Sequence, residues 1–351
     1  MEQKIRCKKI IFLYTELSGY IINSFENASL SGFEVHVVNY PINNEAPFEF
    51  IKNKNIFFYE RSDFKSYHDI YTLINNIKPG AIFLSGWVDK DYLNVVKNLS
   101  IKSKKILMLD NPWRGTLFQK IWALYFIFFY KSKFDCIWVP GEPQIKYAKK
   151  LGFKNDYIFE GLYSCNNKIF NNNTLSKFKK SKVILFVGRY SEEKGLQELW
   201  QNFVSINFTL DSKWQLWCVG TGNLWPDRIK DSNIKHFGFV QQEKLVEIIT
   251  GSDIYVLPSK YEPWGVSLHE MVSMGKPVLV SDKVGSSYRF VKNDVNGFIF
   301  SHKKKNDFKS KMKKLMKLSK KDLEKMGKES LNLSKSISTN TWVKTLNKIY
   351  D

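Results

Sequence analysis

The sequence predicts an α/β protein built from two doubly wound domains. Short apolar runs that end at Gly, Pro, Ser, Asn or Asp recur along the 351 residues. The stretches between them are long enough for helices that connect parallel strands. The pattern stops over an Asn-, Lys- and Ser-rich stretch and then restarts at Lys182. A chain of this length can bury two sizeable cores, which fits two domains of ordinary size.

Each apolar run predicts one buried parallel strand, because a strand covered on both faces has no reason to alternate with polar residues. In the first half the runs are Lys9–Tyr14, Phe33–Asn39, Ala81–Leu84, Lys105–Leu109 and Asp135–Val139. In the second half they are Val183–Val187, Gln215–Val219, Asp253–Leu257 and Pro277–Val280. These runs define an N-terminal domain over 1–165 and a C-terminal domain over 181–335.

The segments outside the two domains have their own patterns. Residues 166–180 contain no long apolar run and predict a linker. The chain from Asp307 onward has helical composition, and 336–351 ends in a helical stripe of apolar residues between Trp342 and Tyr350. Two such domains are expected to face each other across a cleft at the carboxyl ends of their strands, where ligands bind to open α/β sheets.

Composition excludes several classes of protein. Hydrophobic residues make up 43% and charged residues 25% of the chain, which is ordinary for a globular protein and not for a disordered, collagen-like or disulfide-stapled one. The longest apolar run, Ile121–Tyr130, is half the ~20 residues needed to span a bilayer. The first residues lack the pattern of a secretory signal. The four cysteines are widely spaced, which predicts reduced thiols in a cytoplasmic protein.

The net charge of +20 is unevenly distributed. Residues 301–351 hold 15 Lys and Arg against 5 Asp and Glu, whereas 181–300 hold 13 of each. A basic face near the C-terminus is typical of binding to anionic lipid or nucleic acid. The alternative is a solvated helix face with no such partner.

Two glutamates follow the strand that ends at Leu257. Glu262 lies in a turn shaped by Pro263, and Glu270 lies eight residues later within a predicted helix over Val266–Met274. If the helix begins by Pro263, the two carboxylates fall within ~80° of each other around its axis. The free amides at a helix N-terminus bind anions, and carboxylates accept hydrogen bonds from hydroxyls. The alternative is that Glu262 caps the helix and Glu270 is solvated.

Two cations follow the strand that ends at Val187. Arg189 and Lys194 lie five residues apart on the turn that runs from Gly188 to Gly195. Arg supplies a planar fork and Lys a point charge, so the pair suits a diphosphate. The alternative is two surface cations on a loop. After the next strand, Gly220-Thr221-Gly222 indicates only that the backbone at these glycines lies close to a neighbouring group.

Together these stretches resemble glycosyltransferase family 4, the retaining sugar-nucleotide transferases of GT-B architecture. The resemblance rests on G-R-x-x-x-x-K-G at 188–195, on E-x7-E from Glu262 to Glu270, and on the surrounding sequence that includes Gly285 and Asn296-Gly297. It is strong over 180–300 and weaker over 1–165. It implies two Rossmann-like domains facing across a cleft, with the acceptor on the N-terminal side and the donor on the C-terminal side. It also implies that the last helix crosses back to the N-terminal domain.

The resemblance implies a role for each matching residue. Arg189 and Lys194 would neutralise the departing nucleotide diphosphate, Glu262 would accept hydrogen bonds from the donor sugar, and Glu270 would bind the ribose. The other implied donor-binding positions are Gly188, Ser18, Gly19 and the backbone amides near Trp264, Gly265 and Val266. The family is usually assigned a front-side mechanism without a settled nucleophile. Because charge stabilisation is assigned to Arg189 and Lys194, no metal is expected, and no cofactor is expected beyond the nucleotide sugar.

The sequence departs from the family in the N-terminal domain. Many members have a His in the loop after the fourth strand, where this chain has Asp110 and Asn111 instead. Either residue could replace the His as a contact to the donor sugar or acceptor. Asp89-Lys90-Asp91 matches a metal-binding D-x-D motif, but helix capping is the favoured interpretation. His269, beside Glu270, is expected to pack within the protein.

The aromatic run Ile121–Tyr130 has Lys120, Lys131 and Lys133 at its ends. A helix of this composition can rest at a membrane interface. A helix that is hydrophobic nearly all round is more often buried, and burial is the favoured interpretation.

We therefore expect a cytoplasmic, metal-independent retaining glycosyltransferase that moves a sugar from a UDP- or GDP-sugar to a hydroxyl of a glycan or lipid-linked glycan. The expected setting is the assembly of bacterial surface polysaccharide, such as lipopolysaccharide, O-antigen or capsule. Peripheral contact with the inner face of the membrane would involve the aromatic run and basic C-terminal residues, and nucleic acid is not an expected partner. The alternatives are a sugar-nucleotide epimerase of the same architecture and a basic module that binds nucleic acid or anionic lipid.

Overall fold

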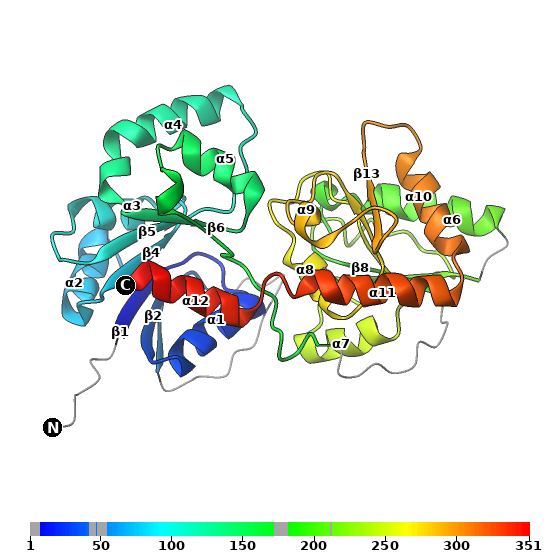
Figure 1. Cartoon of the computed structure of the whole chain (residues 1–351), viewed down its shortest axis with the longest axis horizontal. Coiled ribbons are helices and arrows are strands. Elements are labelled where there is room, and N and C mark those ends of the chain that lie inside the picture. The colour runs from blue at the N-terminus through cyan, green and yellow to red at the C-terminus, as the bar shows by residue number, and fades with distance from the viewer. Residues whose placement is uncertain (1–7, 42–46, 48–54, 172–181, 211–212) are drawn as a thin grey trace. The chain divides into compact units, whose positions relative to one another are not determined.

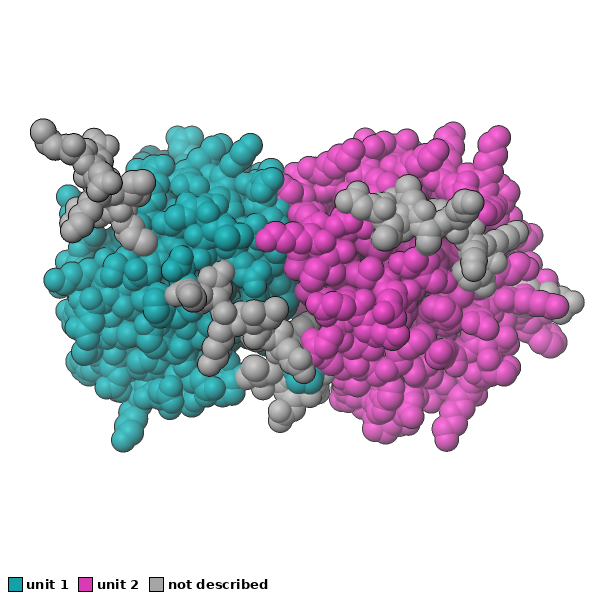
Figure 2. Space-filling view, turned by 90° about the horizontal axis from the view of Figure 1, so that it is seen from below, with its two compact units in different colours: residues 1–164, 339–351 teal, residues 165–338 magenta. Residues whose placement is uncertain are grey.

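The computed structural model describes residues 8–41, 47, 55–171, 182–210 and 213–351 (Figure 1). The chain forms two compact units, coloured separately in Figure 2. Unit 1 comprises residues 1–164 and 339–351, and unit 2 comprises residues 165–338. Of the linker expected over 166–180, residues 172–180 lie outside the described residues.

Unit 1 is built on a parallel sheet with the strand order β3-β2-β1-β4-β5-β6-β7. Its strands are β1 (Lys8–Leu13), β2 (Phe33–Asn39), β3 (Ile56–Glu60), β4 (Ala81–Ser85), β5 (Lys104–Met108), β6 (Cys136–Val139) and β7 (Ile158–Glu160). Its helices are α1 (Gly19–Leu30), α2 (Tyr67–Ile77), α3 (Lys90–Asn98), α4 (Leu117–Phe129), α5 (Glu142–Lys150) and α12 (Thr339–Tyr350). Short 3-10 turns are η1 (Arg61–Asp63), η2 (Lys131–Lys133) and η3 (Asn155–Tyr157).

The two faces of this sheet carry separate apolar cores. One core lies between the sheet and α2 to α5, and the other lies between the sheet and the helices α1 and α12 (Figure 1). In the second core, the Trp342 ring lies 4.9 Å from the ring of Trp138, and its Nε1 donates to the carbonyl of Leu162 at 2.9 Å. A buried hydrogen bond of 3.0 Å from Asn23 Nδ2 to Thr339 Oγ1 joins α1 to α12. The last helix is therefore an integral part of unit 1.

Unit 2 repeats the same winding with the strand order β10-β9-β8-β11-β12-β13. Its strands are β8 (Val183–Val187), β9 (Gln215–Val219), β10 (Ile234–His236), β11 (Ile254–Leu257), β12 (Val278–Ser281) and β13 (Gly297–Phe300). Its helices are α6 (Leu196–Thr209), α7 (Gln242–Thr250), α8 (Val266–Ser273), α9 (Ser287–Phe290), α10 (Asp307–Lys317) and α11 (Lys320–Ser334), with a 3-10 turn η5 (Glu192–Lys194).

The predicted fold class is confirmed, since both sheets are parallel and doubly wound. All nine predicted strands are present with ends within one residue of those expected. The prediction missed β3, β7, β10 and β13, which are the four edge strands of the two sheets. In each sheet the strand order reverses between the two central strands, β1 and β4 in unit 1 and β8 and β11 in unit 2. Ligands of open α/β sheets bind beside such a reversal, at the carboxyl ends of the strands.

The expected burial of the aromatic run is wrong. Within α4 only Ala123 and Phe126 are buried, whereas Leu117, Phe118 and Phe128 are more than 70% exposed. The helix contributes one narrow stripe to the core of unit 1 and leaves the remainder of its apolar surface in contact with solvent.

The predicted helical tail is confirmed and takes the form of α10, α11 and α12. In α10 the apolar residues Phe308, Met312 and Leu315 are buried, while Lys311 and Lys314 form ion pairs with aspartates. The basic stretch in α10 is therefore the polar side of an amphipathic helix, which favours the solvated-face interpretation.

Candidate functional site

Two loops of unit 2 leave the sheet where its strand order reverses. The strands β8 and β11 are hydrogen-bonded neighbours, so the loops that follow Val187 and Leu257 emerge side by side at the carboxyl edge of the sheet. These loops carry the G-R-x-x-x-x-K-G and E-x7-E stretches. The two motifs, which lie about seventy residues apart in the sequence, are thus brought to one place.

The first loop is fixed by its backbone. The N–H of Tyr190 donates to the carbonyl of Thr221 at 2.7 Å, and a Cβ on Gly220 would lie 2.0 Å from the carbonyl oxygen of Gly188. A Cβ on Gly222 would lie 2.6 Å from the carbonyl oxygen of Tyr190. The close approach predicted for these glycines is therefore confirmed, and it joins two loops of unit 2.

The second loop is attached to the first. Gly195 has φ of 71°, and a Cβ there would lie 2.3 Å from the carbonyl oxygen of Pro258. The N–H of Lys260 donates to the carbonyl of Glu193 at 2.6 Å. Both constraints hold the loops at a fixed separation, which is what preorganised charges require.

An ion pair joins the two motifs. Lys194 Nζ lies 2.5 Å from Glu262 Oε2, and the two side chains are only 17% and 12% exposed. Lys194 is therefore not an ordinary surface cation. Among the described residues no side chain caps α8, whose N-cap is Gly265, so Glu262 does not cap the helix. Arg189 is exposed on the same loop.

Glu270 is buried on the second turn of α8. Its side chain is far from the solvated state considered above, and burial raises its pKa to about 7. The helix begins at Val266, so Glu262 precedes it and the angular relation expected within one helix does not apply. Both carboxylates nevertheless act on one buried group: burial raises the pKa of Tyr255, and the charges of Glu262 and Glu270 raise it further.

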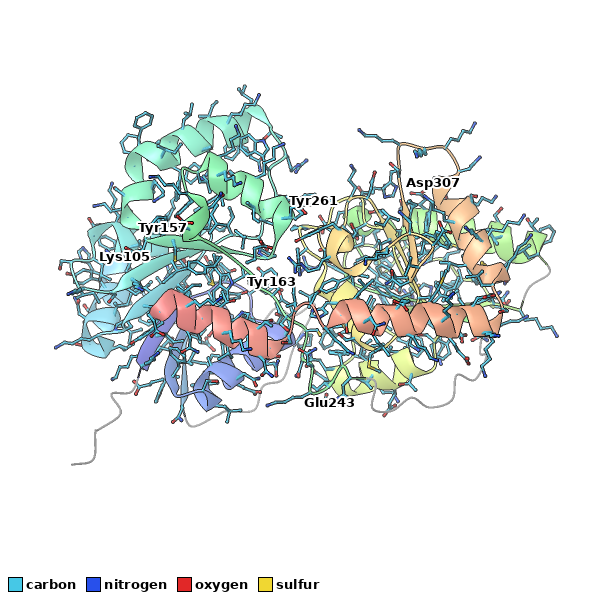
Figure 3. The ribbon with its side chains drawn as sticks, in the orientation of Figure 1. Lys105, Tyr157, Tyr163, Glu243, Tyr261 and Asp307 are labelled. Carbon is cyan, nitrogen blue, oxygen red and sulfur yellow. The ribbon has the colours of Figure 1, made fainter. Side chains whose placement is uncertain are left out.

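A third loop supports the E-x7-E stretch from behind. The N–H of Gly285 donates to the carbonyl of Glu262, and the N–H of Ser286 donates to the carbonyl of Trp264, both at 2.9 Å. Tyr261, which directly precedes Glu262 on this loop, is labelled in Figure 3. The Trp264 side chain is buried, so this residue could bind a ligand only through its backbone.

The amino end of α8 completes the site. Gly265, in the left-handed conformation with φ of 89°, turns the chain into the helix. The first-turn amides of an α-helix have no partner within the helix, and α8 has no acidic residue in its first turn. The amides at Val266 and the residues that follow therefore form the positive end of a helix dipole, beside Lys194.

The expected residues of unit 1 lie at the carboxyl edge of its own sheet. Ser18 is the N-cap of α1 and Gly19 is its first residue, while Asp110 and Asn111 follow β5. The Ser18 hydroxyl is buried without a hydrogen-bond partner among the described residues. Unit 1 thus presents a second set of polar groups at the equivalent edge of the same fold.

Sequence reasoning missed a group of tyrosines around Asp110. Tyr163, labelled in Figure 3, donates from its hydroxyl to Asp110 Oδ2 at 3.3 Å, and its ring packs edge-on against Tyr20 at 5.4 Å. Burial and the nearby Asp110 raise the pKa of Tyr14 and of Tyr163. The sequence did offer one signal for this group: Tyr14 directly follows β1 and so lies at the carboxyl edge of the sheet.

Two other predictions are confirmed. Asp89 caps α3 by accepting from the backbone N–H of Asp91 at 2.8 Å, and Arg61 pairs with both aspartates. The D-x-D stretch is thus a helix cap. His269 is buried and stacks on Phe290, and burial lowers its pKa to about 4.

The buried Glu270 predicts a pH-dependent stability. Because its folded-state pKa of about 7 lies above the ordinary value of 4.5, the folded chain retains a proton that the unfolded chain loses. This stabilising contribution is fully present when the pH is below the ordinary pKa of 4.5, and it is lost as pH rises through about 7. The loss amounts to about 3 kcal/mol in the free energy of unfolding. We expect Glu270→Gln to remove this dependence, which urea unfolding at about pH 5 and about pH 8 would measure. Equal pH dependence in both proteins would contradict the burial of an ionisable group here.

Residues 167–332 match the family model described as glycosyl transferases group 1. An uncharacterized glycosyltransferase of Methanocaldococcus jannaschii is 31% identical over 151 residues, an alignment that covers 41% of this chain and 38% of the relative. The chain thus spans less than two thirds of this relative's length. The match to the family model covers just under half of the chain and lies within unit 2.

Solved structures share the fold over nearly the whole chain. A glycosyltransferase from Rickettsia africae aligns with a TM-score of 0.76 at 14% identity and covers 98% of both chains. A lipopolysaccharide outer core galactosyltransferase aligns with a TM-score of 0.69 at 15% identity and covers 97% of this chain and 98% of the other. The two units thus have the fold of GT-B glycosyltransferases. Within the described ranges, no helix combines the length and the apolar character needed to cross a membrane.

Proposed function

We propose that the protein is a retaining glycosyltransferase that moves one sugar from a UDP- or GDP-sugar to a hydroxyl of a glycan acceptor. The observation that carries the proposal is the ion pair between Lys194 and Glu262, beside the buried Glu270, within the residues that match the glycosyl transferases group 1 model. Cations, helix amides and carboxylates at one sheet edge provide partners for the diphosphate and for the hydroxyls of a nucleotide sugar.

The proposed roles follow the chemistry of each group. Arg189, Lys194 and the amides of Gly188, Gly265 and Val266 would bind the diphosphate, on which negative charge develops as the sugar leaves. Glu262 would accept hydrogen bonds from the sugar, and Glu270 would accept them from the ribose. Since the cations would perform the charge stabilisation, we propose that transfer needs neither a metal nor a cofactor besides the donor.

The ion pair also supports a front-side mechanism. A carboxylate nucleophile must be available to attack the sugar, whereas Glu262 is paired with Lys194 in the structure and is assigned to the sugar hydroxyls when the donor binds. We therefore assign no nucleophile. An oxygen of the departing diphosphate would take the proton of the acceptor hydroxyl while the new glycosidic bond forms on the face that the diphosphate leaves. The sugar thereby keeps its anomeric configuration.

We further propose that unit 1 binds the acceptor, with Asp110 and Asn111 as contacts to it or to the donor sugar. We propose a role in bacterial surface polysaccharide assembly, at the inner face of the cytoplasmic membrane. The chain shares its fold with a lipopolysaccharide outer core galactosyltransferase. The acceptor would then be a glycan or a lipid-linked glycan.

The first experiment is a thermal-shift panel with UDP, GDP, ADP and their common sugars, with and without EDTA. We expect one nucleotide to stabilise the protein by about 2.7 kcal/mol at one hundred times its Kd, with EDTA having no effect. Glu270→Ala should lose most of this stabilisation, because the ribose contact is removed. A folded protein that no nucleotide stabilises would overturn the proposal, and sugar conversion without any acceptor would replace it with an epimerase.

A further inference from the structure

The helix α4 exposes a continuous apolar surface. The described residues of the chain include fifteen large hydrophobic side chains that are exposed, and eight of them lie on this one helix of 13 residues. They are Leu117, Phe118, Ile121, Leu124, Tyr125, Ile127, Phe128 and Phe129. At 100° per residue these positions cover about 200° of the helix circumference, with Lys120 as the charged residue among them. Apolar patches of this kind mark interaction surfaces.

The opposite side of α4 is anchored to unit 1. Ala123 and Phe126 are buried in its core, and the Trp122 ring lies 5.4 Å from the ring of Trp87. In Figure 1 the helix lies at the periphery of unit 1, outside α5. The apolar surface is therefore permanently presented to the surroundings, because the helix cannot turn over without breaking its core contacts.

Cations lie on and beside this surface. Residues 112–154 contain eight Lys and Arg and only two Asp and Glu. At the carboxyl end of α4, the partly buried Lys131 lies over the ring of the core residue Phe153, at 4.4 Å from its centre, and Lys133 is exposed. A Cβ on Gly152 would lie 3.4 Å from Ile127, so the chain just after Lys149 and Lys150 also runs beside α4. Both of these lysines are exposed.

The combination indicates an anionic membrane as the occupant. Protein interfaces are depleted in Lys, whereas a surface of Phe, Leu and Ile beside Lys is typical of helices that lie in the headgroup region. The helix is about 20 Å long and lies flat against the protein, so it would enter one leaflet without crossing the bilayer. Basic residues next to such a helix add electrostatic attraction to anionic lipids.

We propose that the exposed face of α4, with the cations around it, is a docking surface for an anionic lipid bilayer. The surface brings unit 1 to the membrane, where a lipid-linked acceptor would be found, and only this last consequence rests on the proposed function. The docking itself requires no donor, no acceptor and no catalysis.

Co-sedimentation of the full chain with vesicles tests the proposal. The probes are phosphatidylcholine vesicles with and without about one third phosphatidylglycerol. We expect binding to the anionic vesicles that weakens, without vanishing, as salt is raised, and little binding to the neutral ones. Phe118→Ser with Phe128→Ser should reduce partitioning at least about tenfold. The matched control is Phe208→Ser, because Phe208 is 89% exposed on α6 of unit 2, and its change should have no effect.

Two further measurements distinguish a membrane from other occupants of this surface. Lys120→Glu with Lys133→Glu should weaken the preference for anionic vesicles while leaving the helix and its apolar face in place. Light scattering without vesicles should show a monomer. A dimer that Phe118→Ser with Phe128→Ser dissociates, or equal sedimentation of wild type and this variant, would overturn the proposal. Nucleotide-induced stabilisation of the same variants tests the donor site separately, so failure of docking and failure of the proposed function are distinguishable.

Discussion

Replacing both Arg189 and Lys194 by alanine is expected to abolish sugar transfer. The two cations lie on the loop after β8, beside the amino end of α8, and would face the diphosphate on which charge develops. Removal of one preorganised donor of this kind typically costs about a hundredfold to a thousandfold in turnover, or about 3 kcal/mol. Loss of both should therefore place transfer below detection. A coupled assay of UDP or GDP release in the presence of an acceptor would measure it.

The control for this variant must account for Glu262. Lys194→Ala alone leaves a carboxylate that is only 12% exposed without its partner, which costs stability independently of catalysis. Adding Glu262→Gln removes the unpaired charge, so that the thermal midpoint should return toward that of the parent while transfer stays absent. Lys244→Ala disrupts an exposed ion pair with Glu247 and should leave activity unchanged. Near-normal turnover in the double alanine variant would mean that the diphosphate binds elsewhere.

Gly285→Ala is expected to destroy the donor site without altering any residue that would touch the donor. A Cβ at this position would lie 1.9 Å from the carbonyl oxygen of Pro263 and 3.2 Å from the Cα of Trp264. Both neighbours are backbone atoms of the loop that carries Glu262, so this loop must move. We expect a loss of about 3 kcal/mol in stability, typical of severe overpacking, together with loss of nucleotide-induced stabilisation. Urea unfolding and the thermal-shift panel would measure the two effects.

Gly32→Ala provides the comparison. Gly32 has φ of 93°, and a Cβ there would meet no heavy atom within 4 Å. This substitution costs only the backbone strain of a left-handed residue, about 1 to 2 kcal/mol, in unit 1. Nucleotide binding should therefore persist. If Gly285→Ala retained full binding while Gly32→Ala lost it, the supporting role assigned to the loop after β12 would be refuted.

The central strands could be predicted from the sequence because burial on both faces gives them unbroken apolar runs. Three of the edge strands, β3, β7 and β10, could not, because they are largely unburied. The fourth, β13, is mostly buried but begins at Gly297 and has only three apolar residues. In β3 only Ile56 is buried, and in β10 only Ile234 is. Their pairing is determined by the adjacent strand in the finished sheet, and the short local sequence does not reveal it.

The candidate site was predictable as a set of residues but not as a geometry. Glu262 and Lys194 lie 68 positions apart, so their ion pair exists only once β8 and β11 are neighbours. The protonation state of Glu270 likewise depends on its burial, and the periodicity of α8 alone does not determine that burial. For α4 the error came from hydropathy itself, because a helix that is apolar all round satisfies the pattern of a core helix whether or not a neighbour covers it.

Unit 1 is assembled from two segments that are separated by the whole of unit 2. The ring of Trp342 packs against Trp138 and Phe12, so the core on that face of the first sheet stays open until α12 arrives. Residues 165–338 form a continuous stretch, which leaves the ribosome complete before α12 does. Since domains generally fold as units during synthesis, the second unit can reach its native state while the first still waits for its final helix. Unit 1, whose first segment is translated before unit 2, can therefore be completed after it.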